Sequence, residues 1–244
     1  MLRFGGTQMD KVIIGIVAKY DETMDRRTEA LIRNEIKNAI IANGGIAIGI
    51  LPTFTELDFI ALGEDNINLD YLTPQNKKDL IQQINLCDGI IIQGGKTSNK
   101  YEAWIAKYTY DHDIPTLSIC AGQNMAIRAV GGTTKKICNP EKHYQQNADY
   151  VHDIFIDKNS DFYKIVKTDK MKVNSRHIRT INDPTKYYRV AAVCDDGYYD
   201  VLEAVGKKFN LAVRFHPESL YHMDKKHNAI FQAFIKASKE YKNK

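Results

Sequence analysis

Residues 114–133 read IPTLSICAGQNMAIRAVGGT. Residues 115–119 form a short apolar run of strand length, residues 123–130 have the pattern of a short helix, and Cys120 lies at the turn between them. A sharp turn with small residues between a buried strand and a helix is typical of a nucleophile elbow, which presents one side chain at the carboxyl edge of a sheet. The stretch therefore predicts part of an α/β sheet and a candidate nucleophile.

The rest of the first half repeats this alternation of apolar strand and amphipathic helix. Strands that are apolar throughout and separated by helices indicate a parallel sheet covered on both faces. We expect strands at residues 12–17, 46–51 and 89–92, and helices at residues 27–43, 73–86 and 99–111. In such a sheet the functional loops leave the carboxyl ends of the strands.

The second half has shorter, partly alternating apolar runs joined by turn signals. This pattern predicts strands at residues 150–156, 171–174, 188–193, 200–205 and 211–215, then a terminal helix at residues 225–241. We therefore predict an α/β fold, a three-layer sandwich with a central, mostly parallel, flavodoxin-like sheet and an antiparallel extension. Residues 11–244 are expected to form a single domain, and residues 1–10 a loose N-terminal extension with Met9 as an alternative start.

Composition narrows the class of protein. The 244 residues suit one large domain, and 43% hydrophobic with 26% charged residues is typical of a globular chain. A net charge of +4 from scattered lysines gives no nucleic-acid footprint, and no apolar run is long enough to cross a membrane. Because no signal peptide is evident and no Cys-x-x-Cys pair occurs, we expect free thiols and a cytoplasmic location. The histidines lack metal-ligand spacing with the cysteines, so neither a metal nor a cofactor is indicated.

A second candidate group follows the last predicted strand. His216 and Glu218 are two residues apart, so in an extended chain they point to the same side, where the carboxylate can orient the imidazole. Taken alone, a cysteine such as Cys120 is more often a small buried hydrophobic residue, and His216 also fits a surface histidine before a proline. Together, a cysteine and a histidine at strand ends fit the spatial requirement of a nucleophile and its base.

The third feature is the sequence Gln93-Gly94-Gly95 after the strand at residues 89–92. Glycines allow backbone N–H groups to approach a ligand closely. With the N–H of Ala121 they could form an oxyanion hole. Taken alone, the glycine pair favours a plain strand-to-loop turn.

In this order, the three features resemble the class I glutamine amidotransferase-like superfamily, and its gamma-glutamyl hydrolase branch in particular, including gamma-glutamyl-gamma-aminobutyrate hydrolases. The resemblance covers residues 12–234. It is carried by six stretches, which read ANGGIAIGILP (42–52), CDGIIIQGG (87–95), IPTLSICAGQNMAIRAVGGT (114–133), VNSRH (173–177), DDGYYDVLEAV (195–205) and VRFHPE (213–218). The VNS-x-H stretch separates this branch from biosynthetic amidotransferases.

The resemblance implies roles for single residues. Cys120 would be the nucleophile, His216 the base and then the acid, and Glu218 the residue that orients it. Gly94, Gly95, Ala121, Asn124 and His177 would lie around the substrate or its oxyanion, although His177 could equally be a structural histidine.

The sequence departs from the family pattern at five positions. Ser118 replaces a glycine, Ala121 an arginine, Asn124 a glutamine, Gln93 a proline and Phe215 a frequent tryptophan. The missing arginine would remove a fixed positive charge beside the elbow. These changes bear on the substrate more than on the reaction type.

Three functions remain open at this point. The first is a cysteine-dependent hydrolase, of peptidase type, that cleaves the amide bond of a small gamma-glutamyl compound through a thioester. The second is a glutaminase subunit that supplies ammonia to a separate synthase, and the third is a non-catalytic module that binds a small molecule on the same fold. The compound or amine and the oligomeric state, a homo-oligomer included, are not readable from the sequence.

Overall fold

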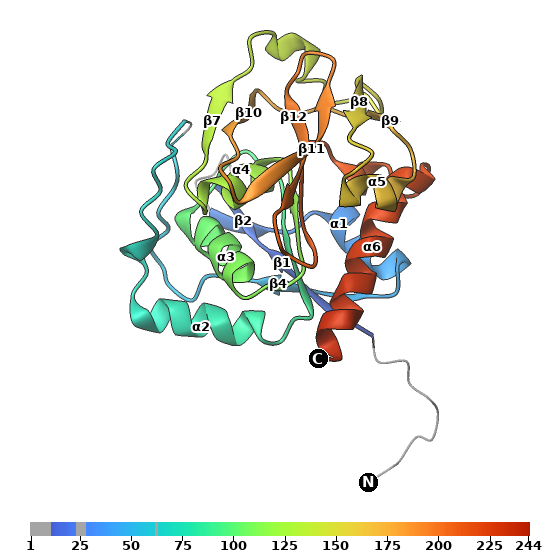
Figure 1. The fold of residues 1–244 in the computed structure, drawn as a ribbon. Coiled ribbons are helices and arrows are strands. Elements are labelled where there is room, and N and C mark those ends of the chain that lie inside the picture. The colour runs from blue at the N-terminus through green and yellow to red at the C-terminus, as the bar shows by residue number, and fades with distance from the viewer. Residues whose placement is uncertain (1–10, 23–27, 62) are drawn as a thin grey trace, which may run out of the picture.

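The structure is a computed structural model that describes residues 11–22, 28–61 and 63–244, so the expected N-terminal extension and alternative start lie outside the described residues. Its centre is a nine-stranded sheet (Figure 1). In chain order the strands of this sheet are β1 (Ile13–Val17), β4 (Ile46–Ile50), β5 (Gly89–Ile92), β6 (Thr116–Ile119), β8 (His152–Ile156), β9 (Lys170–Val173), β11 (Tyr188–Cys194), β12 (Tyr199–Ala204) and β13 (Asn210–Val213).

The sheet has the order β4-β1-β5-β6-β13-β12-β11-β8-β9. The first five strands pair in parallel, and β13, β12, β11, β8 and β9 pair antiparallel. The predicted mostly parallel sheet with an antiparallel extension is thereby confirmed. Because β13 lies between β6 and β12, the two halves of the chain meet in one sheet, and the loops after β5, β6 and β13 share one edge.

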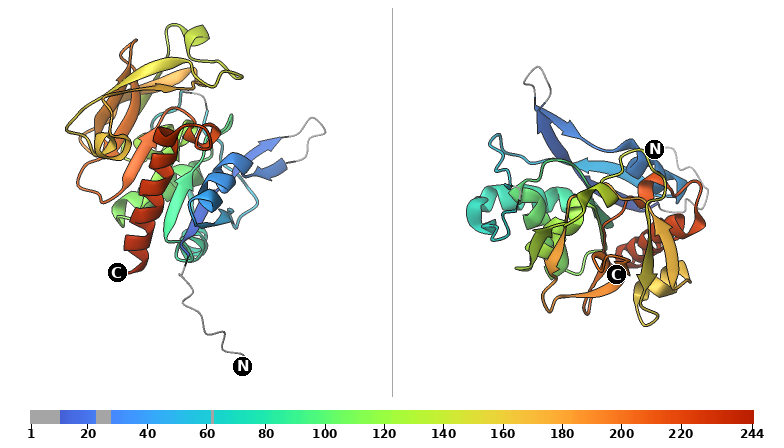
Figure 2. Two further views of the ribbon diagram at one scale, coloured as in Figure 1. Left: turned by 90° about the vertical axis from the view of Figure 1, so that its right-hand side faces the viewer. Right: turned by 90° about the horizontal axis from the view of Figure 1, so that it is seen from above.

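Helices cover both faces of the sheet, as buried parallel strands require. Ile91 packs with α1 (Asn34–Ala42) and α6 (Lys225–Lys242) on one face, whereas Ile90 and Ile92 pack with α2 (Pro74–Ile84) and α3 (Lys100–Asp111) on the other. Figure 1 and the turned views of Figure 2 show the two helical layers on either side of the strands. The other described helices are α4 (Ala121–Arg128) and α5 (Asp161–Val166), with short 3-10 turns at Leu69–Tyr71, Pro140–Lys142 and Pro217–Ser219. Within the described ranges, none of the helices is both long and apolar enough to cross a bilayer.

The helix predicted at residues 27–43 begins too early. The structure has a hairpin of β2 (Lys19–Glu22) and β3 (Thr28–Leu31) there, and α1 starts only at Asn34. The side chain of Gln93 accepts a hydrogen bond from the Arg33 N–H at 3.0 Å and donates one to the Leu31 carbonyl at 2.8 Å. These tertiary bonds hold the backbone extended where the local sequence indicates a helix.

A second two-stranded sheet was not predicted. It pairs β7 (Thr133–Lys136) with β10 (Arg179–Asp183) and lies beside α4. Its position brings the segment after the VNSRH stretch close to the helix that begins at the elbow.

Candidate active site

Cys120 lies between the last residue of β6 and the first residue of α4. Its φ of 53° and ψ of −107° fall in a region that only glycine adopts without strain, at a cost of about 1–3 kcal/mol for another residue. The start of α4 is also packed tightly against the sheet, because a Cβ on Gly122 would lie 2.0 Å from the Ile92 carbonyl oxygen of β5. The backbone therefore forms the sharp strand-to-helix turn that the sequence predicted.

His216 follows β13 and reaches the same edge of the sheet. Its Nδ1 lies 2.6 Å from Oε1 of Glu218, and both side chains are buried. Asn174, from the VNSRH stretch, holds the backbone of His216 at both ends. It accepts from the His216 N–H at 2.7 Å and donates to the His216 carbonyl at 2.8 Å. Glu218 therefore holds the imidazole ring and Asn174 holds the backbone of the same residue, so the orientation of the ring is fixed.

The side chains of Cys120 and His216 lie close together, since both would contact a Cβ placed on Gly94. Burial opposes charge on the thiol, but the interaction with His216 outweighs it and holds the pKa of Cys120 below its ordinary value. Burial likewise opposes charge on His216, yet the charges of Glu218 and Cys120 raise its pKa to about 10. The two shifts therefore favour a thiolate–imidazolium pair over a neutral thiol and imidazole.

The glycine pair predicted to face the site is close to it. A Cβ on Gly94 would lie 3.0 Å from Cβ of Cys120 and 3.0 Å from Cε1 of His216, so a side chain at this position would crowd both groups. Gly95 lies against the Lys19 side chain. Gly95 and Ala121 both line the cavity beside Cys120. Only residues without large side chains leave space beside the sulfur here.

A cavity of about 540 Å³ opens on Cys120 and His216. Asn124 and His177 also line it, and Nε2 of His177 has no hydrogen-bond partner among the described residues, whereas its Nδ1 lies 3.1 Å from the Arg179 carbonyl. Burial lowers the pKa of His177, so its imidazole is neutral. All eight site residues predicted from the sequence thus lie at one edge of the sheet.

The lining of this cavity is strongly cationic. Its described residues include no Asp or Glu but six basic side chains, namely Arg33, Lys96, Arg128, Arg176, Arg179 and Arg214. Some of these are already partnered, since Arg128 contacts Asp65 and both Arg128 and Arg179 donate to Thr134. The remaining charge favours an anionic ligand.

Sequence reasoning missed Arg214. Its guanidinium is buried and donates to the Cys120 carbonyl at 3.2 Å and to Oδ1 of Asn124 at 2.9 Å. A buried positive charge is thus present beside the elbow although position 121 has no arginine, because Arg214 directly follows β13. The signal was present, since Arg214 is two residues before His216 and in an extended chain points to the same side.

Comparisons with known proteins agree with this arrangement. The family model described as Peptidase C26 matches residues 96–218, which include the elbow and the His216–Glu218 pair. A CTP synthase of Chlamydia trachomatis is 26% identical over 72% of this chain, and the chain spans only 38% of that protein. A glutamine amidotransferase-like protein of Rickettsia prowazekii is 24% identical over 94% of this chain and 99% of its own length.

Solved structures show the same fold. A GMP synthase component from Thermoplasma acidophilum has a TM-score of 0.64 at 15% identity and covers 95% of this chain and 96% of its own. The glutaminase domain of a Trypanosoma brucei CTP synthase with bound acivicin has a TM-score of 0.62 at 16% identity, with 94% of both chains covered. The predicted glutamine amidotransferase type of fold is confirmed.

Proposed function

Since the chain belongs to the Peptidase C26 family, a glutamine amidotransferase-like family of hydrolases that act on C–N bonds, we propose that it hydrolyses gamma-glutamyl amide bonds through a thioester on Cys120. The observation that carries the proposal is the Cys120–His216–Glu218 arrangement at one end of a cationic cavity. A thiolate is the nucleophilic form of cysteine, and the pair holds it next to its proton donor.

The reaction follows from these positions. The Cys120 thiolate attacks the side-chain carbonyl of the gamma-glutamyl group, and backbone N–H groups of Gly94, Gly95 and Ala121 stabilise the oxyanion, each by roughly 3 kcal/mol. The His216 imidazolium gives its proton to the leaving amine as the C–N bond breaks, which leaves a thioester. The neutral imidazole then takes a proton from water, whose oxygen attacks the thioester and releases glutamate and the thiolate.

The cavity supports a substrate larger and more negative than glutamine. Its volume is in the range of sites that enclose a whole small molecule, and its basic lining suits carboxylates beyond that of the glutamyl group. Arg176 is a candidate for such a contact, because its Nε has no partner among the described residues and only Nη1 is engaged, by Ser219. A gamma-glutamyl compound with an acidic leaving group is therefore the substrate class that we favour.

The alternative is a glutaminase subunit that supplies ammonia to a separate synthase. It is favoured by the similarity to CTP synthases, of which this chain spans about two fifths. The same thiolate chemistry would release ammonia from glutamine, so the two functions differ in the leaving group and in the need for a partner.

A panel of amides incubated with the isolated chain separates the two functions. We expect glutamate release from gamma-glutamyl compounds, fastest where the leaving amine carries a carboxylate, and little release from glutamine. The matching alpha-glutamyl isomers are the control. If glutamine is the one amide hydrolysed, or if hydrolysis begins only after a synthase is added, the glutaminase is favoured. If no amide of the panel is hydrolysed, the result counts against both functions.

The charge pair predicts a bell-shaped dependence of kcat/KM on pH. Activity should rise as Cys120 loses its proton, below the ordinary thiol pKa, and fall near pH 10 as His216 loses the proton that it gives to the leaving amine. Glu218→Gln removes the largest charge that raises the His216 pKa, so the alkaline limb should move to lower pH.

Glu240→Gln is the matched control, because Glu240 is exposed on α6, and its profile should equal that of the unmodified chain. Circular dichroism at each pH separates loss of activity from unfolding. An alkaline limb that stays in place in Glu218→Gln would show that Glu218 does not set the protonation of His216.

A further inference from the structure

A second cluster of reactive side chains lies in the antiparallel part of the sheet. His152 begins β8, Cys194 ends β11 and Asp200 is the second residue of β12, and each offers one ligand atom within 4.8 Å of the others. The three strands are neighbours in the order β12-β11-β8. Cys194 pairs with Ile154, so His152, two residues away, shares its face of the sheet.

The polar atoms of this cluster are buried and poorly satisfied. Cys194 and Asp200 are 3% and 1% exposed, and Oδ1 of Asp200 and both ring nitrogens of His152 have no hydrogen-bond partner among the described residues. Nε2 of His152 lies 3.4 Å from Oδ2 of Asp200. Buried polar atoms without partners cost free energy, and a bound cation would satisfy those that face it.

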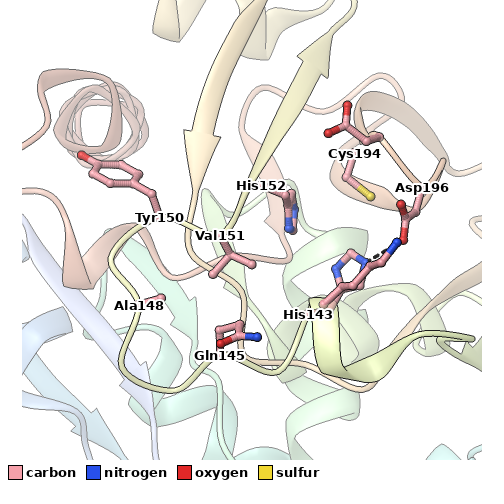
Figure 3. Close-up of a pocket in the computed structure, with 10 residues that line it drawn as sticks. His143, Gln145, Ala148, Tyr150, Val151, His152, Cys194 and Asp196 are labelled. Atoms are coloured by element: carbon pink, nitrogen blue, oxygen red, sulfur yellow. Dashed lines mark hydrogen bonds and ion pairs between the residues drawn. The ribbon is translucent and has the colours of Figure 1, made fainter.

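The cluster is reachable from solvent. A pocket of about 580 Å³ opens on His152 and Cys194, and Figure 3 shows both side chains on its wall together with His143 and Asp196. The His143 ring centroid lies 5.0 Å from that of His152, and Nδ1 of His143 has no partner among the described residues. The Nε2 of His143 faces Asp196 at 3.4 Å, which is the usual way in which a carboxylate orients an imidazole beside a metal.

We propose that His152, Cys194 and Asp200 bind a Zn²⁺ ion, with the fourth position open to the pocket beside His143. Imidazole, thiolate and carboxylate are the ligand types that Zn²⁺ takes in tetrahedral sites, whereas Mg²⁺ and Ca²⁺ select oxygen. On binding, the S–H bond of Cys194 is replaced by an S–Zn bond and the proton passes to solvent. Spacing along the chain predicted no metal site, because it could not show that three adjacent strands bring these residues together.

The cluster is connected to the Cys120 cavity. The Asp200 carbonyl accepts from the Arg214 N–H at 2.7 Å, and Arg214 in turn donates to the Cys120 carbonyl. The His143 ring also lies 5.3 Å from the ring of His177, which lines that cavity. A bound ion would therefore fix the start of β12 next to Arg214, which donates a hydrogen bond to the elbow.

Titration calorimetry with ZnCl₂ tests the proposal. It is carried out on the full chain with Cys120→Ala, because a thiolate beside an imidazole could otherwise bind zinc at the Cys120 site, and the result does not depend on any activity. We expect saturable binding of one Zn²⁺ per chain and a higher melting temperature. Cys194→Ser and Asp200→Asn, added singly, should each weaken binding at least about tenfold.

Cys138→Ser is the matched control, because Cys138 is exposed and outside the cluster, and it should leave binding unchanged. Co²⁺ gives a second readout, a sulfur-to-cobalt charge-transfer band that should be lost in Cys194→Ser and kept in Cys138→Ser. Absence of saturable binding by the folded chain would overturn the proposal. So would Zn²⁺ binding by the Cys194→Ser or the Asp200→Asn variant that is as tight as in the parent Cys120→Ala chain.

Discussion

Replacement of Cys120 by Ala is expected to lower kcat/KM for gamma-glutamyl amides by roughly 10⁴-fold or more, with KM little changed. The reason is that the other groups cannot form the thioester. The His216–Glu218 pair and the backbone N–H groups would remain, so the cavity should still bind the substrate. Initial rates of glutamate release, with binding measured separately by calorimetry, test both parts of this prediction.

The folded structure of Cys120→Ala should be retained, because the change removes only one sulfur atom from a tight turn. Equal far-ultraviolet circular dichroism spectra and similar melting temperatures are the control. Activity that survives the substitution would show that another group performs the reaction, and the proposed function would then be wrong.

Labelling with a glutamine-mimicking diazo-ketone gives an independent measure of the same thiol. Burial raises the pKa of Cys87 to about 12 and that of Cys194 to about 11, so both are thiols at neutral pH, whereas the pKa of Cys120 is lowered. Cys138 is exposed but outside the cavity. Stoichiometric modification of Cys120 alone would support catalysis, whereas equally slow modification of all four would support the non-catalytic binding module.

The parallel core was readable from the sequence because its strands are buried on both faces. The bounds predicted for β5 agree with the structure, and those of β1, β4 and β6 differ by one residue at one end. A run such as GIII has no polar position to disturb the pattern. The rule that loops at the carboxyl ends of parallel strands meet at one edge then located Cys120, Gly94 and His216 close together.

The segments that the sequence did not reveal are held by tertiary polar contacts. All four residues of β3 are exposed, so no apolar alternation marks that strand, and Leu31 and Ile32 were counted wrongly as a helix face. In β7 and β10, Thr134 and Arg179 are polar residues that are nevertheless buried, and the Arg179 guanidinium donates to the Thr134 hydroxyl at 2.9 Å. Local periodicity carries no information about such contacts, which join residues far apart in the chain.

The same limit applies to the site. The positions of Cys120, His216 and Glu218 follow from strand ends, but the contact of Asn174 with the His216 backbone and that of Arg214 with the elbow depend on side-chain directions. These contacts join residues far apart in the chain, so the sequence pattern alone did not show them.

Gly122→Ala is expected to destabilise the fold by about 3–5 kcal/mol, although alanine is the better helix former by about 1 kcal/mol. Gly122 is the second residue of α4, where helix propensity alone predicts a gain in stability. A Cβ at this position would lie 2.0 Å from the Ile92 carbonyl oxygen and 2.9 Å from its carbonyl carbon. Because these are backbone atoms of the central strand β5, no side-chain rotation can relieve the clash.

Gly44→Ala is the matched control for the clash. Gly44 has a φ of +84°, and a Cβ there would meet nothing within 4 Å, so the substitution tests backbone strain alone and should cost about 1–2 kcal/mol. Urea unfolding of both variants measures the two free energies. If Gly122→Ala costs no more than Gly44→Ala, the elbow does not need contact between α4 and β5. A larger cost would mean that this glycine lets the helix start close enough to the sheet to place Cys120 beside His216.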